Sequence, residues 1–411
     1  CRWKLDKGSF AQCAVQRPRN VIPLNMPQQR PFLIDVSRLI WRAWSLRLPT
    51  GIDRVCLAYL SHYGARSHAV IQKRSLRIVL NAKASDALFQ LLLHGRTHVR
   101  SNLAAFLAQS GWQRERDVRG KLYLNVGHTG LDARSLPNWL KRTKLRSIYL
   151  VHDLIPITHP HYCRAGEADR HVKRMRHLLE SADGVIANSQ DTLDQLALFA
   201  SSQRIPFPKH KLVALLGTKE PQIAATSIVR PSRPYFVVIG TIEARKNHLL
   251  LLKIWQRLVR DLGEKAPMLM LIGQRGWEID DVAQILDEDH SLQGHVVELG
   301  RCSDAQMIGL VGGARALLMP SFAEGFGIPV IEALQSGTPV IASNLDVFRE
   351  FAGDIPLYLR PDDAEAWMDA ILSYSEGSED RQRQVELIPN YAAPNWEDHF
   401  RHVDSWLESV S

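Results

Sequence analysis

Residues 319–334 read MPSFAEGFGIPVIEAL, and this stretch decides the fold. An apolar run ends near Met319, a loop with two glycines follows, and Pro329 marks the first turn of a helix, where proline is favoured. A buried strand that leads through a glycine loop into a helix is the repeating unit of α/β domains with parallel sheets. The stretch therefore predicts a doubly wound domain, with Glu324 in the loop and Glu332 about one turn into the helix.

The same alternation extends in both directions and predicts two domains. Apolar runs indicate strands at residues 32–36, 77–80, 121–126, 147–151 and 184–188, and again at 235–239, 268–272, 295–299, 316–319 and 340–342. Such sheets bind ligands beyond the carboxyl ends of their strands, so we expect a deep cleft between the domains. The predicted parts are a tail (1–30), a Rossmann-like domain (31–218), a linker (219–234), a second Rossmann-like domain (235–388) and a C-terminal helix that packs back on the first domain (389–411).

Charge and cysteine content restrict the class of protein. The 411 residues carry a net charge of +8, which divides into +20 over residues 1–220 and −12 over residues 221–411. A basic half suits an anionic membrane, a pyrophosphate-linked lipid or nucleic acid, although it also suits a merely soluble surface. The five cysteines form no C-x-x-C pair, which favours a reducing compartment. No apolar run is long enough to span a membrane and no signal-peptide pattern opens the chain, so a cytoplasmic location is expected.

A second motif lies at residues 238–248, VIGTIEARKNH. A strand ends at Gly240, and Arg245 and Lys246 then precede a helix. Cations at a helix N-terminus oppose the helix dipole, so this pair is easier to understand if an anion binds there. The same cations could stabilise charge on a leaving diphosphate.

Both motifs resemble retaining glycosyltransferases of the GT-B fold, family-4 type, including bacterial polysaccharide mannosyltransferases. The two glutamates match the E-x7-E signature of that family, and QSGTPVIA at 335–342 is also similar. The resemblance implies that Glu324 contacts the transferred sugar and Glu332 the ribose of a nucleoside diphosphate sugar. It implies that Arg245 and Lys246 bind the diphosphate. Gly240 and the backbone around the start of the helix, at Gly325, Phe326 and Gly327, are expected to contribute to the same site.

Two segments of the first half resemble the family less closely. His152, in YLVHDLIP (149–156), matches a histidine beside the transferred sugar, and we expect it to bond a sugar hydroxyl. Gly51, in LPTGIDRV (48–55), matches a glycine loop near the diphosphate, although the usual form has two adjacent glycines, and a role for Arg54 is less well supported. LIGQRGW (271–277) and LGRCSD (299–304) lie where the family binds the base, and Asn188 lies at the end of a predicted strand, facing the expected cleft.

Two further patterns concern metals and membranes. Asp287, Glu288 and Asp289 formally match a D-x-D metal motif but follow no apolar strand, so we interpret them as a solvated helix end and predict no metal requirement. Residues 136–146, LPNWLKRTKLR, have the composition of an interfacial helix, and 171–177 add further cations. Solvated basic helices are the alternative for both segments.

The sequence thus predicts a hexosyltransferase, with GDP-mannose favoured as donor and a glycan or a polyprenyl-diphosphate-linked acceptor in surface-polysaccharide or lipopolysaccharide synthesis. Peripheral contact with the anionic inner face of the plasma membrane is expected, and no nucleic acid. Lys246→Ala is expected to abolish turnover with little loss of fold. The alternatives are a sugar-nucleotide epimerase of the same fold, a basic nucleic-acid-binding protein and a catalytically inactive scaffold.

Overall fold

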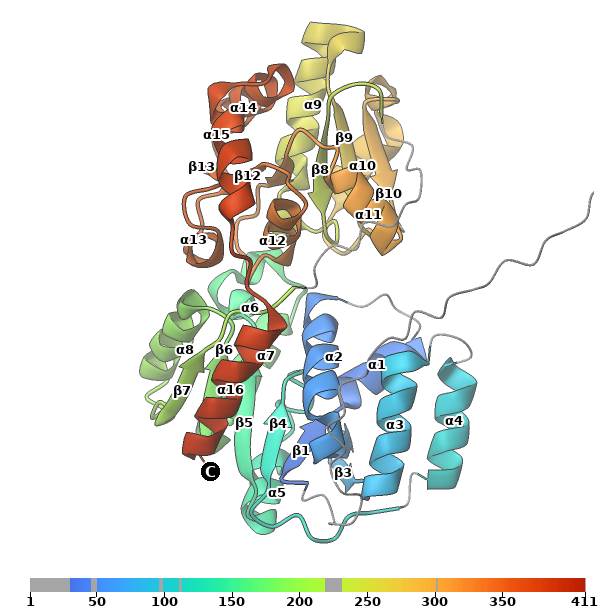
Figure 1. Ribbon diagram of the computed structural model, residues 1–411, viewed down its shortest axis with the longest axis vertical. Helices are drawn as coiled ribbons and strands as arrows, with labels where there is room; N and C mark the ends of the chain where they lie inside the picture. Colours follow the sequence, from blue (N-terminus) through green and yellow to red (C-terminus); the bar gives the residue numbers. More distant parts are fainter. Residues whose placement is uncertain are drawn as a thin grey trace, which may run out of the picture.

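The computed structural model describes residues 30–45, 50–95, 99–110, 113–218, 231–300 and 302–410. Most of the tail expected over 1–30 and of the linker expected over 219–234 lies outside these residues. Two α/β domains follow one another along the long axis of the molecule, and the chain returns to the first domain at its end (Figure 1).

The first domain contains a seven-stranded sheet in the order β3-β2-β1-β4-β5-β6-β7. Its strands are β1 Phe32–Asp35, β2 Ser67–Lys73, β3 Leu76–Val79, β4 Leu122–Asn125, β5 Arg146–Val151, β6 Gly184–Ala187 and β7 His210–Val213. Its α-helices are α1 Ser37–Ser45, α2 Gly51–Tyr63, α3 Ala82–His94, α4 Val99–Ser110, α5 Ser135–Thr143, α6 Ile155–Thr158, α7 Glu167–Ser181 and α8 Gln190–Ser202.

One edge of this sheet differs from the prediction of parallel strands. β3 runs antiparallel to β2, and the described strands from β2 to β7 are otherwise parallel. The two strands are joined by a tight turn in which Arg74 adopts a positive φ of 54°. Such a turn leaves no room for the crossover helix that a parallel connection needs.

The second domain contains a six-stranded parallel sheet in the order β10-β9-β8-β11-β12-β13. Its strands are β8 Tyr235–Ile239, β9 Met268–Ile272, β10 Val296–Leu299, β11 Leu317–Met319, β12 Val340–Ser343 and β13 Leu357–Leu359. Its α-helices are α9 His248–Leu262, α10 Asp280–Glu288, α11 Asp304–Val311, α12 Ile328–Gln335, α13 Asp346–Ala352, α14 Ala364–Glu376 and α15 Glu379–Leu387, and α16 Trp396–Val410 follows.

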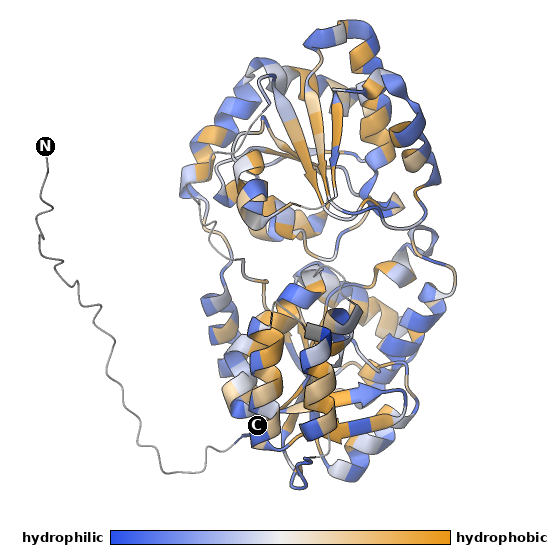
Figure 2. Cartoon of the chain, turned by 90° about the vertical axis from the view of Figure 1, so that its right-hand side faces the viewer, coloured by the Kyte–Doolittle hydropathy of each residue, from blue (hydrophilic) through white to orange (hydrophobic). Residues whose placement is uncertain are grey.

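Both sheets are buried on both faces. Leu33 and Ile34 of β1 are almost fully buried although they point to opposite sides, and Phe236 and Val237 of β8 do the same in the second domain. In Figure 2 the strands of the second domain are mostly orange between helices with blue outer surfaces. Such continuous apolar strands explain why the sequence pattern predicts parallel sheets with helices on both sides.

The last helix, α16, lies against α2 of the first domain. Phe400 stacks on His62 with ring centroids 4.0 Å apart, and the Tyr63 hydroxyl donates to an Asp404 oxygen at 2.9 Å. Trp406 lies over Gly184 at the start of β6, where a Cβ would come within 2.7 Å of its ring. This helix therefore forms part of the core of the first domain.

The chain crosses between the domains twice, and the described ends of the two crossings run side by side. Thr218 forms a parallel bridge with Asn395, and its amide donates to the Pro394 carbonyl at 3.2 Å. A Cβ on Gly217 would lie 2.2 Å from the Trp396 nitrogen, so only glycine fits there. The two crossings are thus in direct backbone contact.

The strand order reverses at one place in each sheet. In the second sheet this switch lies between β8 and β11, which are hydrogen-bonded neighbours. Loops at the carboxyl ends of strands that flank a switch diverge and leave a crevice for ligands. The loops that carry Arg245 and Glu324 follow these two strands, so the fold brings them together.

Candidate functional site

Four charged side chains form a buried cluster at the switch of the second sheet. Lys246 Nζ donates to Glu324 Oε1 at 2.7 Å, and Arg245 Nη1 lies 2.9 Å from Glu324 Oε2. Arg245 also bonds Glu243 Oε1 through Nη2 at 2.6 Å. The Ser321 hydroxyl donates to Glu324 Oε1 at 2.7 Å. Arg245 and Lys246, predicted from one motif, are therefore both in contact with Glu324, predicted from the other.

The cluster keeps Glu324 ionised. Burial alone would raise the pKa of its carboxyl, but the charges of Arg245 and Lys246 and the hydrogen bonds from Lys246 and Ser321 outweigh burial and lower the pKa to about 2. Burial would lower the pKa of Arg245, and the charges of Glu324 and Glu243 raise it instead. Two cations and two carboxylates balance, so none of the four buried charges is left without an opposite charge in contact.

Glycines give these groups the space that they occupy. Gly240 has a φ of 136°, and a Cβ there would lie 3.3 Å from Lys246 Cε. Gly327 has a φ of 111°, and a Cβ there would overlap the Phe348 ring at 2.5 Å. A Cβ on Gly325 would lie 2.7 Å from the carbonyl oxygen of His152 in the first domain. Gly325 thus brings the glutamate loop into contact with the predicted histidine segment.

His152 is buried just after β5, and its Nε2 lies 2.7 Å from the Val126 carbonyl oxygen. A carbonyl only accepts, so Nε2 carries the proton and Nδ1 keeps its lone pair. Burial lowers the pKa of His152 to about 4, so the ring is neutral at pH 7. Asp153 does not pair with it through the side chain, because its Oδ1 accepts from the Ile155 amide at 3.1 Å.

Two other residues lie around His152, and of these His128 was not singled out from the sequence. The His128 ring centroid is 5.1 Å from that of His152, and burial holds the pKa of His128 well below its usual value. Asn188 Nδ2 donates to the carbonyls of His152 and Gly325, at 2.9 and 3.0 Å. Only its place at a strand end marked Asn188 in the sequence. These contacts join the two domains at the site.

The first turns of α2 and α12 contact each other across the domain boundary. A Cβ on Gly51, the first residue of α2, would lie 3.8 Å from the Ile328 side chain at the start of α12. Arg54, one turn further along α2, donates through Nη1 to Glu332 Oε1 at 2.7 Å. Arg54, whose role had less support from the sequence, therefore contacts Glu332, one of the two predicted glutamates.

The segment between α6 and α7 makes two further contacts across the boundary. Tyr162 stacks on Phe322, with ring centroids 5.0 Å apart and planes at 11°. The Arg164 guanidinium lies 4.9 Å from the centroid of the Trp277 ring. Trp277 belongs to the 271–277 segment expected near the base, and Arg301 of the other expected segment lies outside the described residues.

The expectation that residues 136–146 form an interfacial, membrane-binding helix is wrong. α5 buries its apolar side chains, Leu136, Trp139 and Leu140, in the core of the first domain. The pattern of apolar and basic residues was real, but the apolar face is already covered by protein. The acidic run at 287–289 makes local contacts: Asp287 binds Arg275 at 2.7 Å, and Asp289 accepts from Gln256 at 2.6 Å.

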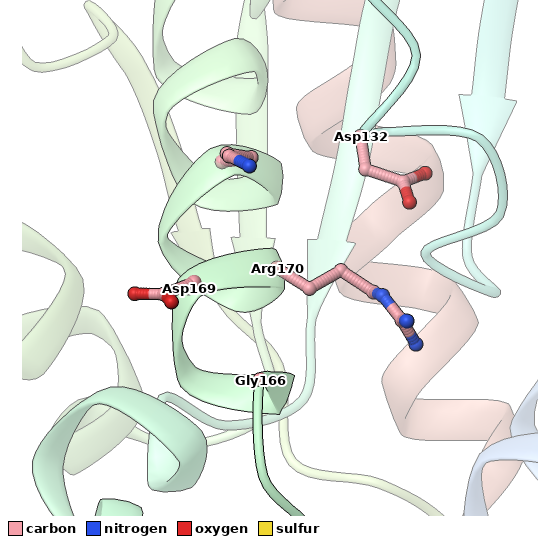
Figure 3. A pocket seen from close by; sticks show the side chains of 5 residues that line it. Asp132, Gly166, Asp169 and Arg170 are labelled. Atoms are coloured by element: carbon pink, nitrogen blue, oxygen red, sulfur yellow. The ribbon is translucent and has the colours of Figure 1, made fainter.

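A surface pocket lies beside α7, away from the charged cluster. It is lined by Asp132, Gly166, Asp169, Arg170 and Lys173. Arg170 and Asp132 lie on one side of the helix and Asp169 extends to the other (Figure 3). Arg170 is already bound by Glu167 at 3.1 Å. This pocket of mixed charge contains none of the predicted site residues.

Comparison with known proteins assigns the second domain. Residues 220–389 match the glycosyl transferases group 1 family. This match covers the second domain and leaves most of the first domain unmatched. The family predicted from the glutamate and cation motifs is thus confirmed, and the match includes both motifs.

Curated relatives of this chain include two mannosyltransferases of Escherichia coli. O-antigen chain mannosyltransferase B is 31% identical over 247 residues, which cover 56% of this chain and 61% of that protein. The serotype-specific mannosyltransferase WbdA is 27% identical over 258 residues, which cover 58% of this chain and 31% of that protein. The chain therefore matches less than two thirds of the length of either relative.

Solved structures confirm the fold class. HepE of Anabaena, crystallised with UDP-glucose, aligns with a TM-score of 0.63 at 13% identity over 92% of this chain and 99% of HepE. Sucrose-phosphate synthase of Thermosynechococcus elongatus aligns with a TM-score of 0.58 at 17% identity over 93% and 100%. The chain has the GT-B fold of two Rossmann-like domains. No helix in the described part of the chain is long and apolar enough to cross a bilayer.

Proposed function

We propose that this chain is a glycosyltransferase that moves a hexose from a nucleoside diphosphate sugar to a hydroxyl acceptor with retention of anomeric configuration. The observation that carries the proposal is the contact of Arg245, Lys246 and Glu324 at the switch of the second sheet. Cations held in a water-poor site stabilise a departing diphosphate more strongly than they would in bulk water.

The chemistry divides among these residues by charge. Arg245 and Lys246 stabilise the leaving diphosphate, with the amides at the start of α12 around Phe326 and Gly327. No metal is required in this proposal, because two cations supply the positive charge. Glu332 binds the donor ribose, and Gly51 lets the first domain approach the diphosphate.

Glu324 and His152 orient the sugar. With a pKa near 2 and three donors on its oxygens, Glu324 is a poor nucleophile and a poor proton donor. Its place is to accept hydrogen bonds from sugar hydroxyls, which suits a front-face reaction in which the acceptor attacks on the side of the leaving group. His152 offers the lone pair of Nδ1 to a sugar hydroxyl.

The relatives support a particular donor and acceptor. Both are named as mannosyltransferases and one of them as an O-antigen chain mannosyltransferase, so we propose mannose from GDP-mannose as the donor and a glycan or polyprenyl-diphosphate-linked acceptor. A thermal-shift panel of GDP-, UDP- and ADP-sugars, with and without magnesium, tests the donor, because a ligand that binds only the folded state raises the melting temperature.

Product analysis separates this proposal from an epimerase. A transferase leaves free nucleoside diphosphate and a lengthened acceptor of unchanged anomeric configuration. An epimerase converts one sugar nucleotide into another without an acceptor. Conversion without an acceptor, or a product of inverted configuration, would contradict the proposal.

We also propose peripheral contact with an anionic membrane, and the face of α1 supports it. Trp41 and Trp44 are 65% and 43% exposed on a helix without acidic residues. Exposed tryptophan beside arginine is typical of surfaces that bind lipid headgroups, and the basic first half favours an anionic surface. Wild-type protein should sediment with vesicles that contain phosphatidylglycerol, and a Trp41→Ser/Trp44→Ser variant should not. Equal sedimentation of both would remove α1 from the proposal.

A further inference from the structure

Two helices from opposite domains have their N-termini close together. The first residue of α2, Gly51, lies against the first residue of α12, Ile328. Each helix N-terminus carries a partial positive charge, so two that meet repel one another and favour an anion between them. A further cation in the first turns of either helix is unfavourable unless it has its own partner.

Arg54 is such a cation, and Glu332 is its partner. Asp53, its neighbour on α2, is already bound by Arg38 at 2.6 Å and by Arg42 at 2.7 Å. The Arg54 guanidinium instead crosses the boundary to Glu332, 278 positions away in the chain. The carboxylate remains partly exposed, with 21% of its side-chain surface accessible.

We infer that Arg54 is a positioning residue for Glu332. By holding one carboxylate oxygen from the first domain, it fixes the direction in which the carboxylate faces the ribose of the donor. Ribose recognition is therefore complete only when both domains are together. This inference rests on the proposed function, in which Glu332 binds the ribose.

A second contact across the boundary provides a matched control. The Glu350 carboxylate on α13 accepts from the amides of Gln190 and Asp191 at the start of α8, at 2.6 and 2.9 Å. Like the Arg54–Glu332 pair, it joins a carboxylate of the second domain to a positive group of the first. It touches none of the residues proposed to bind the donor, so its loss reports only on the association of the domains.

The experiment measures nucleotide binding to the full chain by isothermal titration calorimetry. The probes are GDP, UDP and ADP, each compared with its 2′-deoxy and 3′-deoxy counterparts. The proteins are wild type, Arg54→Met, Arg54→Lys, Glu332→Gln and Glu350→Gln. Circular dichroism and the melting temperature check that each variant is folded.

Wild type should bind the ribonucleotide more tightly than a deoxy counterpart, and Glu332→Gln should lose this preference. Arg54→Met should lose most of it and bind the ribonucleotide about two- to fivefold more weakly, as for a partly exposed ion pair. Arg54→Lys should retain part of the preference, and Glu350→Gln all of it.

Three results would overturn the inference. Arg54→Met with wild-type ribose preference would show that Glu332 needs no support. Weaker binding with an unchanged preference would assign Arg54 to the diphosphate instead. Equal losses in Arg54→Met and Glu350→Gln would reduce Arg54 to a contact that joins the domains. If wild type binds none of GDP, UDP and ADP, the proposed function itself fails, and the inference fails with it.

Discussion

Lys246 offers a direct test of whether the charged cluster does chemistry or only stabilises the fold. Its side chain is 10% exposed and donates to Glu324 at 2.7 Å. Removing one partner of a buried ion pair costs about 3–5 kcal/mol when the other charge is left unpaired. Arg245 still faces the second oxygen of Glu324 at 2.9 Å, so we expect Lys246→Met to cost about 2–3 kcal/mol. The buried ion pair thus predicts a larger loss of stability than the sequence-based expectation for Lys246→Ala, and both stay predictions.

A double-mutant cycle separates the two roles. Glu324→Gln removes the charge that Lys246 neutralises. The double variant Lys246→Met/Glu324→Gln should therefore lose about 1–3 kcal/mol less unfolding free energy than the two single variants lose in total. Turnover should respond differently. Loss of one electrostatic stabiliser typically lowers kcat by about 10²–10³-fold, and the double variant should be no more active than Lys246→Met.

Urea unfolding measures the stabilities, and release of nucleoside diphosphate from the donor measures turnover. Arg257→Ala, which breaks an exposed pair with Glu365, is the control and should change either quantity little. Wild-type turnover in Lys246→Met, or recovery of turnover together with stability in the double variant, would refute the catalytic role of Lys246.

Three further outcomes are expected. Gly325→Ala should separate the glutamate loop from His152, because the new Cβ would meet the His152 carbonyl oxygen at 2.7 Å. The kcat should fall although each domain remains folded. An unchanged kcat would show that turnover does not depend on this contact. The unfolding free energy should decrease as pH falls from about 6.5 to about 4, because His152 takes up a proton in that range when unfolded, whereas the buried ring, with a pKa of about 4, does not. The full contribution of His152 to the unfolding free energy is about 3 kcal/mol. The urea midpoint of His152→Asn should therefore depend less on pH than that of wild type. Phe400→Ala should destabilise the protein by about 3–5 kcal/mol, and a midpoint within error of wild type would show that α16 is dispensable.

The fold was predictable because its strands are apolar on both faces and alternate with helices. The error at β3 arose because β2 ends in polar residues, Gln72 and Lys73, and was not recognised as a strand. Without β2, the tight turn that makes the pair antiparallel could not be seen. The edge of the sheet is thus less visible in the sequence than its centre, where every residue is buried.

The site was predictable residue by residue but not as an arrangement. Arg245, Lys246 and Glu324 stand in two motifs about 80 positions apart, and only the adjacency of β8 and β11 brings them together. Nothing in the sequence pairs Arg54 with Glu332, because that contact depends on how the domains associate. The opposite failure occurred at α5, since an amphipathic pattern shows that a face will be covered but not by what.

The paired crossings at Thr218 and Asn395 have a consequence for engineering and for evolution of this architecture. The first domain is discontinuous in sequence, because α16 belongs to its core although the entire second domain precedes it. A chimera that exchanges the second domain between two chains of this architecture must be cut twice, once at each crossing. A single cut would leave one parent's α16 against the other parent's α2, and the hybrid would have to repack around Phe400 and Trp406. Recombination at one site is therefore disfavoured, and insertion of a whole domain between Thr218 and Asn395 is the exchange that the packing permits.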